Sequence, residues 1–201
     1  MSSACVLVGP DQVHLITDGA AMAWGKLVGA ASKAVPLPHL DAAIAVRGKL
    51  PVAREITAIV STFPDLPTLL STIENLLKKR FRWRLWGLRD FDLYIACLHE
   101  GAPAGFMISS VDRPGFPAFR LKALGVAHAT PEVSPETLRK ASDKSDSSTA
   151  RNVAIAANML LAEQRKSGIV GVYGQVTSIS PRGIVMQIVK RWPDEVGKPI
   201  S

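Results

Sequence analysis

The chain has little cysteine, few aromatic residues and no long uninterrupted hydrophobic run. Two cysteines, Cys5 and Cys97, are too few for a disulfide framework or a set of metal ligands, and each lies in an apolar run typical of a buried thiol. The spacing of the histidines matches no metal site, so we assign no metal and no cofactor. No apolar stretch approaches the ~20 residues that a membrane-spanning helix needs, and no secretory leader opens the chain. We therefore expect a cytoplasmic protein.

Size and composition are those of a folded domain. The chain has 201 residues, of which 47% are hydrophobic and 20% charged, so it can bury a substantial core. We expect a single domain over residues 1–201. Because aromatic residues amount to only 6%, Ala, Val, Leu and Ile must supply most of the packing.

Positive charge is concentrated in one segment, Lys78 to Arg89, within a chain of net charge +7. Basic side chains interleaved with Phe81, Trp83 and Trp86 could grip phosphates and stack on bases. The alternative is the solvated end of a helix, where cations interact favourably with the helix dipole. We favour the helix end, because no nucleic-acid-binding motif accompanies the segment.

Short apolar runs bounded by turn residues predict β-strands. Pro10-Asp11, Gly101-Ala102-Pro103 and Ser180-Pro181-Arg182-Gly183 each separate two such runs, which predicts three hairpins. His14 alternates with apolar neighbours, so we place it on the surface face of its strand. The expected strands are 4–9, 12–18, 41–47, 91–98, 104–110, 119–126, 170–179 and 183–190.

Apolar residues at helical spacing predict helices over 52–62, 65–79 and 149–164. Asp65 or Thr68 is the expected cap of the second helix and Ser148 that of the third. Residues 129–148 are polar and are expected to hold a short helix and a loop.

This order of strands and helices favours an α+β fold over regular βαβ alternation. Two stacked antiparallel sheets with a helical layer on each outer side, a four-layer αββα sandwich, would accommodate it.

Four residues near the N-terminus form the most informative pattern: Ser2, Asp18, Lys33 and Gly48. A hydroxyl residue directly after the initiator Met can become the first residue of the mature chain. Its own α-amino group, with an ordinary pKa near ~8, could then activate the hydroxyl. Asp18 ends the second expected strand, and Gly48 follows the strand 41–47. This pattern predicts nucleophilic catalysis by the chain terminus.

The pattern resembles that of the proteasome β subunits, and most closely the two-ring bacterial proteasome-like proteases among the N-terminal nucleophile (Ntn) hydrolases. The resemblance covers the order of elements along the whole chain, whereas the matching residues lie in about the first fifty. It implies that Ser2, after removal of Met1, is the nucleophile and that the charge of Lys33 lowers the cost of ionising its hydroxyl. It also implies that Asp18 holds Lys33 and that the Gly48 N–H binds the oxyanion.

The chain departs from the family pattern in several features. Ser2 stands where the family has Thr, and it lacks the methyl group that restricts the side-chain rotamer. The segment Gln164-Arg165-Lys166-Ser167-Gly168 keeps the Ser-Gly pair of a family motif without its acidic residue. Because a fold can persist without its chemistry, the alternative is a catalytically inactive proteasome-fold subunit with a structural or binding role.

The resemblance also implies partners. A peptide or amide is the expected substrate, and a homo-oligomeric ring is the expected assembly, with the apolar faces of helices 52–62 and 65–79 as contact surfaces. The sequence has no P-loop motif, so any unfoldase would be a separate ATPase chain. We expect neither a nucleic-acid partner nor a membrane.

Overall fold

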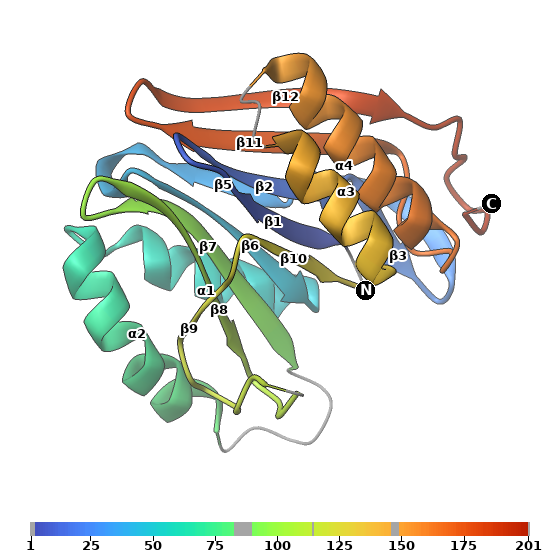
Figure 1. Cartoon of the computed structure of the whole chain (residues 1–201). Coiled ribbons are helices and arrows are strands. Elements are labelled where there is room, and N and C mark those ends of the chain that lie inside the picture. The colour runs from blue at the N-terminus through green and yellow to red at the C-terminus, as the bar shows by residue number, and fades with distance from the viewer. Residues whose placement is uncertain (1–2, 83–89, 114, 146–148, 201) are drawn as a thin grey trace.

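A computed structural model describes residues 3–82, 90–113, 115–145 and 149–200 of the chain. Two five-stranded antiparallel sheets dominate these residues, and helices lie on the outer side of each sheet (Figure 1). The fold is therefore mixed α+β, and its layers are compatible with the predicted sandwich. No helix within these ranges is long and apolar enough to cross a membrane.

The first sheet has the N-terminal hairpin near its centre. Its strand order is β10-β1-β2-β11-β12, and all neighbours are antiparallel. The predicted hairpins 4–9 with 12–18 and 170–179 with 183–190 are confirmed, with small shifts at their ends. The strands are β1 Ala4–Val8, β2 Val13–Asp18, β10 Ala127–Thr130, β11 Tyr173–Ser180 and β12 Gly183–Arg191.

The second sheet has the order β5-β6-β7-β8-β9, again antiparallel throughout. A separate two-stranded sheet, β3 with β4, follows β2 along the chain, and a short 3-10 turn at Pro38–Leu40 joins β5 to β6. The strands are β3 Ala20–Ala23, β4 Lys26–Ala30, β5 Ala34–Leu37, β6 Ala42–Gly48, β7 Phe91–His99, β8 Ala102–Ser109 and β9 Lys122–Ala123.

Two helix pairs cover the sheets, α1 Leu50–Ser61 with α2 Leu66–Phe81 and α3 Pro135–Ser145 with α4 Ala150–Arg165. The first pair packs on the second sheet and the other pair on the first sheet. Asp65 caps α2 by accepting a hydrogen bond from the Thr68 N–H at 2.8 Å. Such side-chain caps satisfy backbone donors that have no partner inside the helix.

Three apolar clusters hold the layers together. Val52, Ile56, Leu69 and Ile73 are among the helix residues buried against the second sheet. These residues carry the apolar faces of helices 52–62 and 65–79, so the prediction that the faces are contact surfaces between subunits is wrong. A second cluster lies between α3, α4 and the first sheet, and a third fills the space between the two sheets.

Other local predictions also need correction. His14 is fully buried, because the strand β2 is covered on both faces. The predicted strand 119–126 is reduced to the two residues of β9, and β10 was not predicted. Thr149 caps α4 through the Asn152 N–H, whereas the predicted cap, Ser148, lies outside the described residues.

The basic segment is described only in part. Lys78, Lys79 and Arg80 form the exposed last turn of α2, as the helix-end alternative predicts. Residues 83–89 lie outside the described ranges.

Candidate functional site

Asp18 is the centre of the candidate site. It ends β2, its side chain is buried, and both of its carboxylate oxygens accept hydrogen bonds. Oδ1 accepts from the Lys33 ammonium at 2.6 Å and from the Ser3 backbone nitrogen at 2.8 Å. Oδ2 accepts from the Ala20 N–H at 2.9 Å and the Gly171 N–H at 3.4 Å. These donors offset the high cost of burying a carboxylate.

Lys33 approaches Asp18 from the residue just before β5. Its side chain is only 14% exposed, so the ion pair is largely shielded from water. Burial lowers the pKa of Lys33, and the nearby Asp18 carboxylate opposes that shift. The predicted roles of Asp18 and Lys33 require the two side chains to be in contact, and they are. The roles themselves stay predictions.

Ser3 links the start of the described chain to the same carboxylate. Its backbone nitrogen donates to Asp18, and its hydroxyl donates to Oε1 of Gln164 in α4. The Ser3 oxygen also lies 3.8 Å from the Cys5 sulfur. The Ser3 side chain therefore points to the side of the first sheet that α4 covers, where its contacts lie. The predicted nucleophile, Ser2, lies outside the described residues.

Gln164, near the end of α4, joins three segments of the chain. Its Oε1 accepts from Ser3 and from the Cys5 thiol, the latter at 3.4 Å, and its Nε2 donates to the Pro131 carbonyl at 2.5 Å. An amide can accept and donate at once, which an ionised carboxylate cannot. The hydroxyl of Ser167 donates to the Gln164 carbonyl at 2.6 Å at the end of α4. Gln164 and Ser167 therefore both have structural contacts.

Gly48 ends β6 at a point where the backbone is crowded. A Cβ built on this residue would lie 2.8 Å from the Asp90 carbonyl oxygen, and its φ is +153°. Real Cβ atoms essentially never come so close to another atom. This crowding is enough to account for a glycine at position 48, without any catalytic role. The proposed binding of an oxyanion by the Gly48 N–H therefore stays a prediction.

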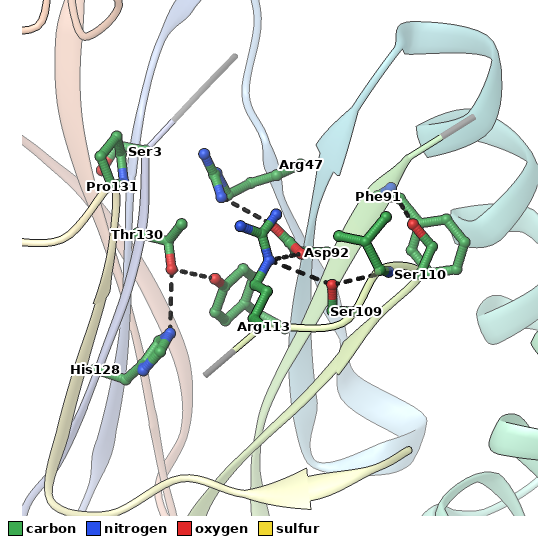
Figure 2. Close-up of polar contacts among 12 residues, drawn as sticks. Ser3, Arg47, Phe91, Asp92, Ser109, Ser110, Arg113, His128, Thr130 and Pro131 are labelled. Atoms are coloured by element: carbon green, nitrogen blue, oxygen red, sulfur yellow. Dashed lines mark hydrogen bonds and ion pairs between the residues drawn. The ribbon is translucent and has the colours of Figure 1, made fainter. Parts of the chain in front are cut away.

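An ionic network begins at the buried Arg47, the residue before Gly48, and reaches the exposed Arg113 (Figure 2). Arg47 Nη1 donates to Asp92 Oδ2 at 2.7 Å. Arg113 donates to the same carboxylate from Nε at 3.1 Å and from Nη2 at 3.0 Å, and its Nε also lies 3.3 Å from the Ser109 hydroxyl. One carboxylate thus faces two guanidinium groups. The sequence pattern did not predict the network, although an arginine inside an apolar strand indicates a buried partner.

A second polar chain crosses from β7 to β10 (Figure 2). The Tyr94 hydroxyl donates to Thr130 Oγ1 at 2.6 Å, and His128 Nε2 lies 3.1 Å from the same oxygen. Burial lowers the pKa of His128, which favours the neutral ring, and burial also raises the pKa of Tyr94 to about 12. The chain therefore joins the two sheets without adding charge.

The segment that supplies the Gly171 N–H is itself held by an ion pair. Arg165 in α4 binds Asp194 through two hydrogen bonds, at 2.6 and 2.9 Å. Arg165 also donates to the Val170 carbonyl at 3.0 Å, and Asp194 accepts from the Val172 N–H at 2.7 Å. The sequence pattern did not predict this contact, because the two charged residues are far apart in the chain.

The chemistry open to the site is narrow. In the part of the chain that the structure describes, no group of three or more His, Cys, Asp or Glu side chains could hold a metal ion. Burial raises the pKa of Cys5 to about 11 and that of Cys97 to about 12, so neither thiol is a ready nucleophile. What remains is a shielded cation–anion pair beside the first described residue, an arrangement able to stabilise a developing negative charge.

Comparison of the sequence with known proteins adds no identification: no protein-family model matches it, and neither does any curated protein.

Proposed function

We propose that the protein is a proteasome-like Ntn hydrolase, a peptidase or amidohydrolase, in which Ser2 is the nucleophile after removal of Met1. One observation carries the proposal. The Lys33 ammonium and the Ser3 backbone nitrogen meet on a single oxygen of Asp18, at 2.6 and 2.8 Å. Ser2 is attached to that nitrogen by one peptide bond, so a mature chain would start within a few covalent bonds of the ion pair.

In the proposed reaction the Ser2 α-amine takes the hydroxyl proton through a water molecule, and the hydroxyl oxygen attacks the amide carbonyl carbon. The charge of Lys33 stabilises the ionising hydroxyl, and Asp18 keeps Lys33 in place. The Gly48 N–H donates to the oxyanion. The α-amine returns the proton to the leaving amine, and water then hydrolyses the ester formed with Ser2.

The arrangement of layers supports the Ntn-hydrolase form of the αββα sandwich as the proposed fold. The sheets stack face to face, each carries a helix pair, and the N-terminal hairpin lies inside its sheet rather than at an edge. With this fold we propose a homo-oligomeric ring that acts on unfolded peptide segments, supplied by a separate ATPase.

The second candidate is an inactive subunit of the same fold. Gln164 favours it, because an amide replaces the family's acidic residue and is occupied with Ser3, Cys5 and Pro131. The Asp18 ion pair would then serve only to fasten the chain terminus.

Intact mass and a covalent probe separate the two candidates. The purified full chain is weighed, incubated with a β-lactone that acylates N-terminal nucleophiles, and weighed again. The hydrolase predicts loss of Met1 and one added probe on Ser2. Retention of Met1, or no acylation of a processed chain, would favour the inactive subunit.

Matched variants locate the nucleophile. Ser2→Ala should abolish acylation, whereas Ser3→Ala should preserve it, because the backbone nitrogen that binds Asp18 is unchanged. Lys33→Met should slow acylation by a factor of about 10² or more, the usual cost of losing a positioned electrostatic group. Acylation that survives in Ser2→Ala would contradict the assignment of Ser2.

A further inference from the structure

We propose that β12 is a docking edge for a second copy of this chain. In the proposed contact the β12 strands of two copies pair antiparallel about a two-fold axis at Met186, which joins their first sheets into one continuous sheet. The inference rests on the strand and its surroundings, and it does not depend on the proposed hydrolase.

β12 is the outermost strand of the first sheet (Figure 1). Its inner side pairs with β11, and no other strand of the described residues pairs with its outer side. The outer side of an edge strand carries backbone N–H and C=O groups that point away from the sheet. The partner that matches such a row of donors and acceptors is another strand.

The other edges of the two five-stranded sheets are protected, whereas β12 is not. β10 has four residues and β9 only two, and β5 contains Pro36, which cannot donate to a neighbouring strand. β12 has nine residues, and its segment 183–189 contains neither proline nor a charged residue. Long, uncharged edges of this kind readily pair with other chains.

Apolar side chains of β12 are exposed on both faces of the strand. Val185 is 63% exposed, Met186 39% and Ile188 46%. Ile184 packs against the cluster between the two sheets, so the alternation of the strand places Met186 and Ile188 on the same face as Ile184. Val185 lies on the opposite face. A second strand beside β12 would cover part of both faces at once.

The strand is complementary to itself when Met186 lies on the axis. The two Met186 side chains then face each other, Ile184 faces Ile188 of the second copy, and Val185 faces Gln187. The Ile–Met–Ile stripe of one copy therefore meets the same stripe of the other, and such apolar pairs across strands are stabilising. A two-fold contact requires this property, because both copies contribute the same surface.

The end of β12 favours the antiparallel direction. Ile188 pairs with Gln175 and Lys190 with Gly174, so Val189 has no opposite residue in β11 and the regular ladder ends at Ile188. The cations of the strand follow this irregularity. Antiparallel pairing keeps the cationic ends of the two copies apart, whereas parallel pairing would set Lys190 of both copies side by side, which is unfavourable.

The mass of the full chain in solution tests the proposal. Sedimentation velocity of wild type should show an even number of copies, and Met186→Lys, which sets like charges across the axis, should halve the mass. Val28→Lys is the matched control, because Val28 is an exposed apolar residue of β4 in the separate two-stranded sheet. A wild-type chain that stays monomeric, an unchanged mass in Met186→Lys, or an equal loss in Val28→Lys would overturn the inference.

A charge exchange at Met186 tests the two-fold axis. Met186→Glu should dissociate as Met186→Lys does, whereas an equal mixture of the two variants should recover the wild-type mass, because opposite charges then face each other. Circular dichroism checks that each variant is folded, as the exposure of Met186 leads us to expect. Folded variants that do not associate when mixed would contradict the axis.

A disulfide supplies a test that needs no charge in the strand. In Met186→Cys the two new cysteines would lie directly opposite, with Cα atoms about 5 Å apart, which suits a disulfide. The native cysteines are buried, so oxidation should give one covalent dimer on a non-reducing gel. Lys190→Cys is the control, because the two copies of this residue would lie about 25 Å apart. No dimer in Met186→Cys, or equal cross-linking of both variants, would overturn the proposed pairing.

Discussion

His14 should make the stability of the protein fall in mildly acidic solution. The side chain is fully buried in β2, and its Nδ1 lies 2.9 Å from the Ser178 hydroxyl. Burial lowers the pKa of His14 from 6.5 to about 4, because the protonated ring would be removed from water. The unfolded chain therefore binds a proton at a higher pH than the folded chain does.

The sign and size of the effect follow from this difference. The neutral His14 ring adds to the free energy of unfolding. This contribution is fully present above about pH 6.5 and is lost as the pH falls toward 4. The whole difference corresponds to about 3 kcal/mol, of which about 2 kcal/mol should be lost by pH 5.

Urea unfolding of wild type and His14→Asn at pH 7 and pH 5 measures the effect. The asparagine amide does not titrate and can keep a hydrogen bond to Ser178, although the smaller side chain lowers stability at every pH. The stability advantage of wild type should therefore shrink by about 2 kcal/mol between pH 7 and pH 5. His39→Asn, at an exposed position, is the control for the loss of any histidine. An advantage that is the same at both pH values would refute the reasoning.

Three further predictions concern stability and thiol chemistry. Thr177→Val should raise the unfolding free energy by about 1 kcal/mol in urea, because the buried hydroxyl has no hydrogen-bond partner among the described residues; a clear loss would show that a partner exists. Gly48→Ala should cost about 1–3 kcal/mol, since its Cβ would meet the Asp90 carbonyl, whereas Gly29→Ala, with open space around its Cβ, should not; equal thermal midpoints would contradict this. Both cysteines should be inert to a thiol reagent in the native protein and react in denaturant, because they are fully buried; native labelling would contradict their burial.

The sequence predicted those elements whose apolar period is strong. The helix 65–79 appears as Leu66–Phe81, since its leucines and isoleucine recur at helical spacing and Asp65 supplies the cap. Weak patterns were missed for physical reasons. β3 consists mainly of alanine, and α3 buries only Ala141 and Ser145, so neither shows a clear apolar face.

His14 shows where the alternation rule fails. In a two-layer protein one face of a strand meets water, so a polar residue among apolar ones indicates the surface. Here β2 lies between the second sheet on one side and α4 on the other, and every one of its residues is buried. A polar residue of such a strand has no water beside it and can bond only to other buried groups, as His14 Nδ1 does with the Ser178 hydroxyl.

The candidate site was predictable only as separate residues. A resemblance to a family pattern singled out Asp18, Lys33 and Gly48, and the structure brings the first two into contact. The Arg47–Asp92–Arg113 network and the Arg165–Asp194 pair join positions far apart in the chain. The spacing of apolar residues along one strand or helix does not indicate such long-range pairs, so only the folded structure shows them.

The double use of Asp18 determines how variants at this site must be interpreted. Its carboxylate binds Lys33, but it also receives the Ser3, Ala20 and Gly171 N–H groups and so fastens separate segments of the chain. Asp18→Asn would leave one oxygen in place and replace the other by an amide that cannot accept. Loss of acylation in that variant would follow equally from lost chemistry and from a loosened terminus. Among the described residues the Lys33 side chain bonds to the Asp18 carboxylate and not to a backbone group, so the pH profile of Lys33 variants tests the chemistry more directly.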